Sequence, residues 1–311
     1  MDRKQLRTLL AVAEHHSFSA AAIALGTVQS NVSAHVSRLE NELGVTLIDR
    51  ATTEPTPEGR VVLERARRIE GEFDCLSSDL AYLRDVVVGT VRLGVIGTTA
   101  RWLVPPLLQA VWNEYPEVHV TVLDAPTTVL VTGITTGTID LGVANLPIEH
   151  PDIHIDPLFT EDRILIVPEG HPLHDHSEVS LEELAQHELL LEAPGTAFRD
   201  VLDTAAAESG VKLRARAEFD GMRLLASLAF AGFGAGVVPA SAIPTGLDGA
   251  WRSIPVVGVP RRNVGLISAH RAMPSAAARM IGELVTRVVA ERDSPERTIT
   301  ADAATADNRE L

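Results

Sequence analysis

Residues 27–44, TVQSNVSAHVSRLENELG, carry side chains of the kinds that recognise DNA bases. Amide, hydroxyl, imidazole and guanidinium groups hydrogen-bond to the base edges that line the major groove. Small residues among them let such a segment approach another surface closely. The pattern is also typical of a solvated surface helix, so the segment alone leaves both interpretations open. The base-reading groups belong to Gln29, Asn31, Ser33, His35 and Arg38.

Metal and catalytic chemistry find less support in the sequence. Residues 171–176, HPLHDH, bring three histidines close together, and imidazole is a common zinc ligand. We nevertheless predict no metal site, because no cysteine lies nearby and the spacing fixes no fourth ligand. Residues 232–236, GFGAG, follow a predicted helix and precede a predicted strand, the reverse of the order in a dinucleotide-binding loop. With no Walker loop and no G-x-S-x-G elbow, we predict no catalytic residue, no cofactor and no enzymatic activity.

The base-reading groups need a helix to hold them, and the apolar spacing of residues 27–44 predicts one. Its apolar residues are Val32, Val36, Leu39 and Leu43. Their spacing of three or four places them on one stripe that faces a core. Two shorter helices are predicted upstream, over residues 6–15 and 17–26, with Gly26 as a left-handed stop. Three helices with a tight turn before the last resemble a helix-turn-helix.

A long helix is predicted over residues 58–88, with apolar side chains at alternating spacings of four and three. The apolar positions are Val62, Ala66, Ile69, Phe73, Leu76, Leu80, Leu83 and Val87. An unbroken heptad pattern of this length is typical of a coiled-coil seam, and a second copy of the chain is its simplest partner. Packing of the seam against its own chain is the alternative. We therefore expect a homodimer, and leave open whether dimers pair into a homotetramer.

From residue 90 onward, short β-branched runs alternate with helical patterns. This alternation is typical of α/β units with largely parallel sheets. Two similar α/β halves, followed by a late return of the chain, predict two lobes with a small-molecule cleft between them. Residues 293–311 are polar and aperiodic, and we predict that they are disordered.

Composition limits the compartment and the partners. A formal net charge of -15 over 311 residues disfavours indiscriminate binding to nucleic acid or to anionic membranes, so any DNA contact must be local and specific. The single cysteine, Cys75, excludes an intrachain disulfide and indicates a reducing compartment, which we take to be the cytoplasm. No apolar run is long enough to span a membrane, and no secretory signal is evident. We favour a structural thiol over a redox sensor for Cys75, since no basic neighbour lowers its pKa.

The N-terminal part resembles the winged helix-turn-helix of LysR-type transcriptional regulators, including their dimerising linker helix. The resemblance rests on Ser17-Phe18-Ser19, Ala21-Ala22, Gln29-Ser30, Ser33, Leu39-Glu40, Leu43-Gly44, Leu47 and Arg50, in the family's order and spacing. It implies a helix that binds a dyad-related site on double-stranded DNA. The residues that it implies at the DNA are Gln29, Ser30, Asn31, Ser33, Ala34, Ser37, Arg38 and Arg50.

The rest of the chain resembles the effector-binding domain of the same family, which is similar to a type 2 periplasmic binding protein. The matching residues are Tyr115-Pro116, 137–142, His171-Pro172-Leu173, Gly232-Phe233-Gly234 and Val238-Pro239. The resemblance implies a small-molecule effector held between the lobes by groups at strand-to-helix turns. The residues at those turns are Thr98, Thr99, Thr127, Asn145 and Thr196. Each threonine can equally be a helix cap, and Arg101 and Arg199 can each be either a partner for an effector carboxylate or a solvated surface residue.

The predicted architecture is an α+β multidomain chain. Residues 1–58 form the winged helix-turn-helix domain, residues 59–89 the linker helix, and residues 90–292 the effector-binding domain. Within the last, lobe 1 comprises residues 90–160 and 264–292, and lobe 2 comprises residues 161–263.

Two departures from the family pattern leave a second function open. The wing, ATTEPTPEGR, is short and contains Glu54, with basic residues only at its edges, Arg50 and Arg60. The N-terminal domain is also not basic, which predicts few neutralised phosphates and a flat salt dependence. Our first hypothesis is an effector-controlled, sequence-specific transcriptional regulator, with RNA polymerase as a further expected partner. The alternative is a small-molecule-binding module that signals through protein contacts and carries a degenerate DNA-binding domain.

Overall fold

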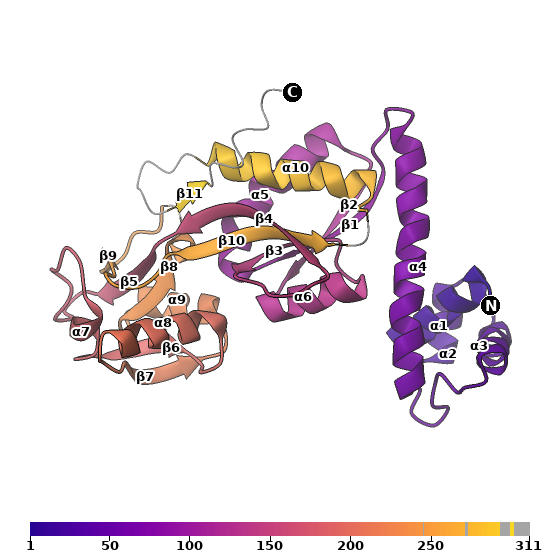
Figure 1. Ribbon diagram of the computed structural model, residues 1–311, viewed down its shortest axis with the longest axis horizontal. Coiled ribbons are helices and arrows are strands. Elements are labelled where there is room, and N and C mark those ends of the chain that lie inside the picture. The colour runs from indigo at the N-terminus through magenta and orange to yellow at the C-terminus, as the bar shows by residue number, and fades with distance from the viewer. Residues whose placement is uncertain (245, 271–272, 293–298, 302–311) are drawn as a thin grey trace.

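The computed structural model describes residues 1–244, 246–270, 273–292 and 299–301. Along the chain it forms an N-terminal helical domain, one long helix and two α/β lobes (Figure 1). The N-terminal helices are α1 (Arg3–His15), α2 (Phe18–Ala24) and α3 (Gln29–Leu43), and the long helix is α4 (Pro57–Tyr82). Figure 1 shows α4 standing between the N-terminal helices on one side and the lobes on the other. None of the helices in the described ranges is long and apolar enough to cross a membrane.

Side-chain caps set the bounds of the first two helices. The Asp2 carboxylate accepts a hydrogen bond from the Gln5 backbone N–H at 2.8 Å, and the Gln5 side-chain oxygen accepts one from the Asp2 backbone N–H. The Ser17 hydroxyl accepts from the Ala20 N–H and begins α2. These bonds satisfy N–H groups that a helix leaves without an internal partner. The starts of α1 and α2 are therefore fixed by local side-chain chemistry.

The apolar stripe of α3 forms the core of the N-terminal domain. Val32, Val36 and Leu39 are completely buried, in a cluster with residues of α1, α2 and α4. Leu43, the fourth predicted member, is 39% exposed, because it lies in the last turn, before Gly44 ends the helix at a positive φ of 72°. The stripe therefore holds α3 by one face and leaves the opposite face open.

The long helix is shorter at its C-terminal end than the sequence predicts. It stops at Tyr82 rather than near residue 88, and the chain turns through Asp85, which has a positive φ of 59°. Val87 therefore lies outside the helix. At the other end, α4 packs closely on the N-terminal domain, since a Cβ on Gly59 would stand 2.0 Å from the Leu47 carbonyl oxygen.

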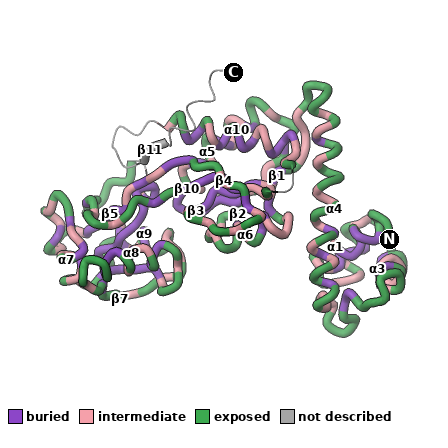
Figure 2. Tube along the Cα trace, viewed as in Figure 1, coloured by how far each residue is buried: buried purple, intermediate pink, exposed green. Residues whose placement is uncertain are grey.

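The lobes are built on two separate sheets. Lobe 1 contains β1 (Gly89–Val95), α5 (Gly97–Glu114), β2 (Val118–Asp124), α6 (Thr127–Thr136), β3 (Leu141–Leu146), β4 (Ile153–Glu161), β10 (Arg262–Ala269) and α10 (Ala276–Glu291). Lobe 2 contains β5 (Arg163–Pro168), α7 (Leu181–Leu184), β6 (Glu188–Glu192), α8 (Ala197–Glu208), β7 (Arg214–Phe219), α9 (Met222–Phe230), β8 (Gly236–Pro239), η1 (Ala240–Ala242) and β9 (Trp251–Pro255). The sheet orders are β11-β4-β10-β3-β1-β2, in which β11 is Ile299–Ala301, and β7-β6-β8-β5-β9. Figure 2 shows the buried residues concentrated in these sheets and the helix faces that cover them.

Both sheets are mixed rather than largely parallel. In lobe 1, β1 pairs in parallel with β2 and β3, whereas β10 runs antiparallel to β3 and β4. In lobe 2, β6 is parallel to β7 and β8, and β5 is antiparallel to β8 and β9. The antiparallel strands are those next to the two points where the chain passes between the lobes. These points are Asp162, between β4 and β5, and the connection from β9 to β10.

Three residues of the polar C-terminal stretch are ordered, contrary to the prediction for them. Residues 299–301 form β11 (Ile299–Ala301), which pairs antiparallel with β4. Residues 293–298 and 302–311 of the predicted disordered tail lie outside the described residues.

Candidate functional site

The polar face of α3 is open to solvent at its first turn. Gln29, Ser30 and Asn31 are exposed, and Arg38 is exposed farther along the same helix. The remaining residues predicted at the DNA are half-buried and small: Ser33, Ala34 and Ser37. Long polar groups thus stand at the edges of a shallow surface, the shape that a base-reading helix needs.

The N-terminus of α3 has no side-chain cap. Its N-cap residue is Val28, which offers no acceptor, so the first N–H groups of the helix remain directed outward. Nearby side chains contact one another: the Ser19 hydroxyl donates to the Gln29 amide oxygen at 3.2 Å, and the Asn31 amide donates to the Thr27 hydroxyl at 3.1 Å. An open helix N-terminus favours a phosphate oxygen through its free N–H groups and the helix dipole.

Arg50 is engaged within its own domain. Its guanidinium pairs with the Glu40 carboxylate at 2.6 Å, donates to the Ser37 hydroxyl at 3.3 Å and lies over the Phe18 ring. Glu40 also accepts from the backbone N–H of Leu47 at 2.9 Å, which fixes the start of the wing. Arg50 therefore holds α3 against the wing, and its remaining donors alone are available to DNA.

Lobe 1 supplies three of the predicted effector residues to one polar cluster around Arg262. The Arg262 guanidinium donates to the Thr98 hydroxyl at 2.9 Å and to the Asn145 side-chain oxygen at 2.6 Å. The Thr127 hydroxyl accepts from the Asn145 backbone N–H at 3.1 Å. Thr98, Asn145 and Thr127 thus converge, although they come from three different elements of the lobe. Thr99 is fully buried, and its hydroxyl has no hydrogen-bond partner among the described residues.

Two carboxylates complete the cluster, Glu161 at the end of β4 in lobe 1 and Glu192 at the end of β6 in lobe 2. Glu161, which is completely buried, accepts from Arg262 at 2.7 Å and from the Ser241 backbone N–H at 2.7 Å. Glu192 interacts with Arg262 electrostatically, and burial raises the pKa of its carboxyl group. Thr196, the fifth predicted effector residue, caps α8 and donates to Glu192 at 3.1 Å. Four of the five predicted residues, all except Thr99, are therefore connected by hydrogen bonds to a buried charge network where the lobes meet.

The buried ion pair at the centre of this network, Glu161 with Arg262, is not predicted from the sequence. Arg262 and Glu161 stand where strands cross between lobes, and a single charged residue beside a strand gives no signal of burial. Burial and the nearby Arg262 lower the pKa of Arg163 to about 10. Arg163 and Arg262 become neighbours around the Glu161 carboxylate only in the folded chain, so the spacing of residues in the sequence does not reveal them.

The two arginines left open by the sequence have different surroundings: Arg199 is buried within lobe 2, whereas Arg101 is exposed and reaches lobe 2. Arg199 is buried, and it pairs with Asp203 at 2.8 Å and Glu218 at 3.0 Å. Arg101 donates to the Ala242 carbonyl at 3.1 Å and so connects α5 to lobe 2. Arg199 is therefore neither a solvated surface residue nor free to bind an effector carboxylate.

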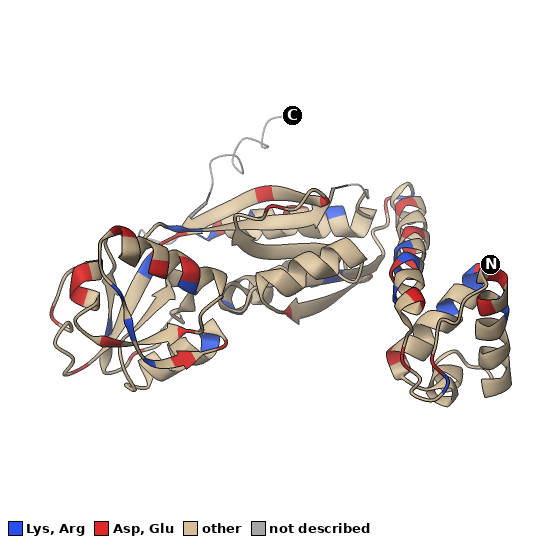
Figure 3. Ribbon diagram, turned by 60° about the horizontal axis from the view of Figure 1, so that its bottom comes forward, with Lys and Arg blue, Asp and Glu red and all other residues tan. Residues whose placement is uncertain are grey.

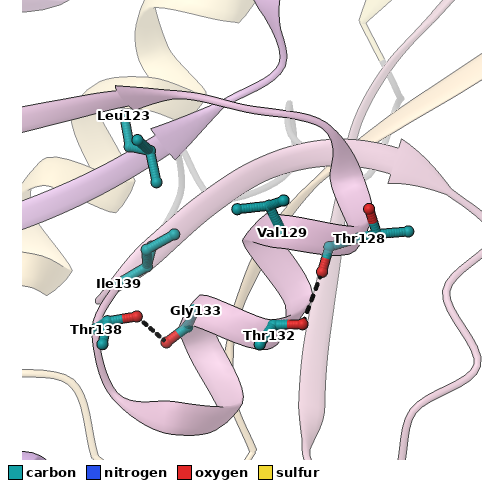
Figure 4. A pocket seen from close by; sticks show the side chains of 7 residues that line it. All are labelled: Leu123, Thr128, Val129, Thr132, Gly133, Thr138 and Ile139. Carbon is teal, nitrogen blue, oxygen red and sulfur yellow. Dashed lines mark hydrogen bonds between the residues drawn. The ribbon is translucent and has the colours of Figure 1, made fainter. Parts of the chain in front are cut away.

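A shallow hollow of about 340 Å³ lies on lobe 1, and none of its lining residues belongs to the Arg262 cluster. It is lined by Leu123, Thr128, Val129, Thr132, Gly133, Thr138 and Ile139, as Figure 4 shows. Two of its hydroxyls donate to backbone carbonyls, from Thr132 to Thr128 and from Thr138 to Gly133. The hollow therefore presents an apolar surface without the convergent polar groups that a specific small-molecule site needs.

The apolar seam of α4 is divided between two uses. Ala66 is buried against the N-terminal domain, as the single-chain alternative predicts. The C-terminal half of the seam is exposed, at Ile69, Phe73, Leu76, Leu80 and Leu83. Figure 2 shows this half of α4 mostly exposed, and Figure 3 shows acidic and basic residues alternating along the helix.

The histidines of residues 171–176 point to different neighbours. His171 lies against the His187 ring at 5.0 Å, His174 contacts Asp175, and His176 contacts Glu183. Across the described ranges, no group of three or more histidine, cysteine, aspartate or glutamate residues is arranged to hold a metal ion. Burial and acidic neighbours raise the pKa of the Cys75 thiol on α4, which disfavours the reactive thiolate.

Comparison with known proteins agrees with this architecture. A model of the LysR substrate binding domain matches residues 84–290, and a model described as bacterial regulatory helix-turn-helix protein, lysR family, matches residues 3–60. A Mycobacterium leprae protein described as a probable hydrogen peroxide-inducible genes activator is 34% identical over 297 residues, which cover 91% of this chain and 93% of that protein.

Solved structures extend the likeness to the whole architecture. Full-length CbnR complexed with its target DNA is 27% identical with a TM-score of 0.68, over 93% of this chain and 100% of that chain. A cysteine-to-serine mutant of Corynebacterium glutamicum OxyR, described as H2O2-bound, is 26% identical with a TM-score of 0.60, over 93% of this chain and 92% of that chain.

Proposed function

Because the chain belongs to the LysR family of DNA-binding transcriptional regulators, which are not enzymes, we propose that α3 is its base-reading helix. The observation that carries this proposal is the exposed, uncharged polar face at the first turn of α3, with Arg38 beyond it. Gln29 and Asn31 supply amides that match adenine edges, and Arg38 supplies a guanidinium that matches guanine. The uncapped N-terminus of α3 binds a phosphate and sets the register of these side chains.

The dimer seam is the exposed C-terminal half of α4. At about 100° per helical residue, the seam residues Ile69, Phe73, Leu76 and Leu80 fall on one face of α4, and Leu83 follows as its C-cap. Ala66 faces the N-terminal domain on one side of that stripe, and Ser78 and Asp79 face lobe 1 on the other side. A third, apolar face is left for a second copy of the chain. Two copies would carry two α3 helices to a dyad-related DNA site.

The effector site is the inter-lobe cluster around Arg262, where Thr98, Asn145, Thr127 and Thr196 converge. An effector there must exchange hydrogen bonds with Arg262, Thr98 or Asn145, which selects a small polar molecule rather than an apolar one. Binding shifts the lobes only by its differential affinity for their two arrangements. RNA polymerase is the expected partner in transcription, and the cytoplasm the expected location.

Cysteine oxidation does not serve this chain as a peroxide switch. Its only cysteine, Cys75, lies in α4, so the effector-binding domain contains no thiol. Sensing through a thiol needs an accessible thiolate and, for a disulfide, a second cysteine. The relatives described as peroxide-inducible activators therefore do not define the signal here. We expect Cys75→Ser to leave both the DNA footprint and its response to added H2O2 unchanged.

Footprinting tests the DNA proposal directly. The purified protein is applied to DNA from upstream of its own and neighbouring genes across a salt series. We expect a protected, dyad-symmetric site whose occupancy falls in Arg38→Ala and in Asn31→Ala, because each variant loses a base contact worth about 1–3 kcal/mol. Arg84→Ala, which removes an exposed cation from the turn after α4, is the matched control and should keep the site. Absence of any protected site with a folded protein would instead favour a binding module that acts through protein contacts.

A thermal-shift screen tests the effector site. Polar small molecules are screened for stabilisation of the wild-type chain, since a ligand that binds the folded state raises the unfolding temperature. Thr98→Val should remove the shift, because it deletes the hydroxyl that Arg262 contacts. Thr121→Val, on the exposed strand β2, is the control and should retain it.

A further inference from the structure

The linker helix α4 caps the N-terminus of α10, a helix that belongs to lobe 1. The Asp79 carboxylate accepts a hydrogen bond from the Ala276 N–H at 2.9 Å, and the Ser78 hydroxyl accepts one from the Ala277 N–H at 3.3 Å. Ser78 is buried and donates in turn to the Val88 carbonyl at 2.8 Å. Two of the orphan N–H groups of α10 are thus satisfied from about two hundred residues away in the sequence.

Charge reinforces this contact. Asp79 is an anion at the positive end of the α10 dipole, and its carboxylate also meets the Arg279 guanidinium at 3.5 Å. The N-cap residue of α10, Ser275, satisfies a third N–H group, that of Ala278. Rotation or withdrawal of α4 would therefore exchange both hydrogen bonds, and the contact of Asp79 with the α10 dipole, for contacts with water, which opposes such movement.

The other end of α10 reaches the effector cluster. At about 1.5 Å per residue, its 16 residues span roughly 24 Å. Arg292, its C-cap, lies 4.0 Å above the Trp102 ring, which packs edge-on against Phe159 of β4. Glu161, the carboxylate paired with Arg262, interacts electrostatically with Arg292. Helix α10 therefore runs from the linker helix toward the buried Glu161–Arg262 pair, and Figure 1 shows its course along lobe 1.

We propose that Ser78 and Asp79 form the joint through which α10 couples the inter-lobe cluster to the linker helix. Both residues act as positioning residues, since they contact neither DNA nor effector. Among the described residues, α4 also contacts lobe 1 through Arg68, which donates to the Thr135 carbonyl near the end of α6. Because α6 begins at Thr127 of the inter-lobe cluster, Arg68 and α6 are the competing route for the same coupling. The proposal rests on the proposed function of α3 and of the Arg262 cluster.

Linkage allows the joint to be tested without a known effector. If the state of the lobes alters DNA binding, DNA binding must alter the lobes by the same factor. Operator DNA from the footprinting experiment is therefore the probe, and hydrogen exchange by mass spectrometry is the readout. The peptides to follow cover α3, the first turn of α10, and the two inter-lobe connections at Asp162 and residues 256–261.

In the wild-type chain, operator DNA should slow exchange in α3 and change exchange at the inter-lobe connections by about fivefold, within the usual range of allosteric coupling. In Asp79→Ala and in Asp79→Asn, protection of α3 should persist, whereas the change at the inter-lobe connections should fall below about twofold. Asp74→Asn, an exposed neutralisation on the same helix, should behave like the wild type. Thermal unfolding checks that each variant is folded.

Three results would overturn the joint. The inter-lobe response could survive in the Asp79 variants, could be lost in Arg68→Ala instead, or could be missing in a wild-type chain whose α3 is protected. Failure of operator DNA to protect α3 would contradict the proposed function of α3 itself, so the two failures are distinguishable.

Discussion

Glu161→Gln should destabilise the effector-binding domain strongly, because it removes the charge that compensates Arg262. Glu161 is completely buried and Arg262 is 6% exposed, with 2.7 Å between the paired atoms. Glutamine keeps the size of the side chain and can still accept from the Ser241 N–H, so the loss is mainly electrostatic. Breaking a buried ion pair by removing one partner costs about 3–5 kcal/mol. For a domain of this size, that corresponds to a fall of about 10 °C in the unfolding temperature.

Tryptophan fluorescence is a suitable assay for this prediction, since all three tryptophans, Trp102, Trp112 and Trp251, belong to the lobes. Asp162→Asn is the matched control. Asp162 follows Glu161 in the chain, but its pair with Arg261, at 2.7 Å, is well exposed, so its loss should cost at most about 1 kcal/mol. Equal shifts for the two variants would refute the view that Glu161 and Arg262 form a desolvated ion pair where lobe 1 meets lobe 2.

Three further predictions follow from packing, association and titration. Gly59→Ala should lower the stability of the N-terminal domain by at least about 2 kcal/mol, because the added Cβ meets the Leu47 carbonyl oxygen. Gly71→Ala, with open space around it, should not lower the stability. Urea unfolding followed by circular dichroism measures both variants. The double variant Leu76→Glu/Leu80→Glu should convert the dimer to monomers in analytical ultracentrifugation, whereas Ser77→Glu on the neighbouring face should not. Dimers of the double variant at micromolar concentration would contradict the proposal that this face of α4 is the dimer seam. Burial raises the pKa of Glu192, so its contribution to stability is present at acidic pH and is lost as the pH rises through the folded-state pKa. Glu192→Gln should therefore flatten the fall in unfolding temperature with rising pH. An unchanged pH profile in that variant would exclude the mechanism.

Much of the fold could be predicted because local patterns are strong in this sequence. The stripe at Val32, Val36 and Leu39 is buried as its spacing indicates, and Ser17 caps α2 through an ordinary side-chain bond. The order of strands and helices in the lobes also follows from alternating patterns. Family likeness then establishes the class of regulator, which the net charge and the wing alone would not have favoured.

Strands β4 and β9 and the early end of α4 have no local signal in the sequence. Strand β4 contains Pro157, which lies at the irregularity of the β4–β10 pairing between Val264 and Gly265, and proline usually argues against an interior strand. Strand β9 has only five residues. The last predicted turn of α4 is absent because Asp85 adopts a left-handed conformation before β1 begins. These features depend on tertiary pairing, which the period of apolar residues does not encode.

The sequence predicts several residues of the candidate sites, but it does not predict which residues they contact. Thr98, Asn145 and Thr127 were identified as residues at strand ends, and the structure brings them together. Arg262 and Glu161, which organise them, are separated by about a hundred residues and become neighbours only where the two lobes join. Arg50 shows the opposite case, since a residue expected at the DNA is held by Glu40.

Binding of the wild type and Arg38→Ala to operators with single base-pair substitutions is the most direct test of the central claim, that α3 recognises bases. If Arg38 contacts a base edge, the wild type should discriminate at one position by about 1–3 kcal/mol, and Arg38→Ala should lose that discrimination while retaining it at other positions. If Arg38→Ala instead weakens binding to all operators equally, Arg38 contacts phosphate alone. If the wild type does not discriminate among the operators at all, the claim that α3 reads the major groove is contradicted.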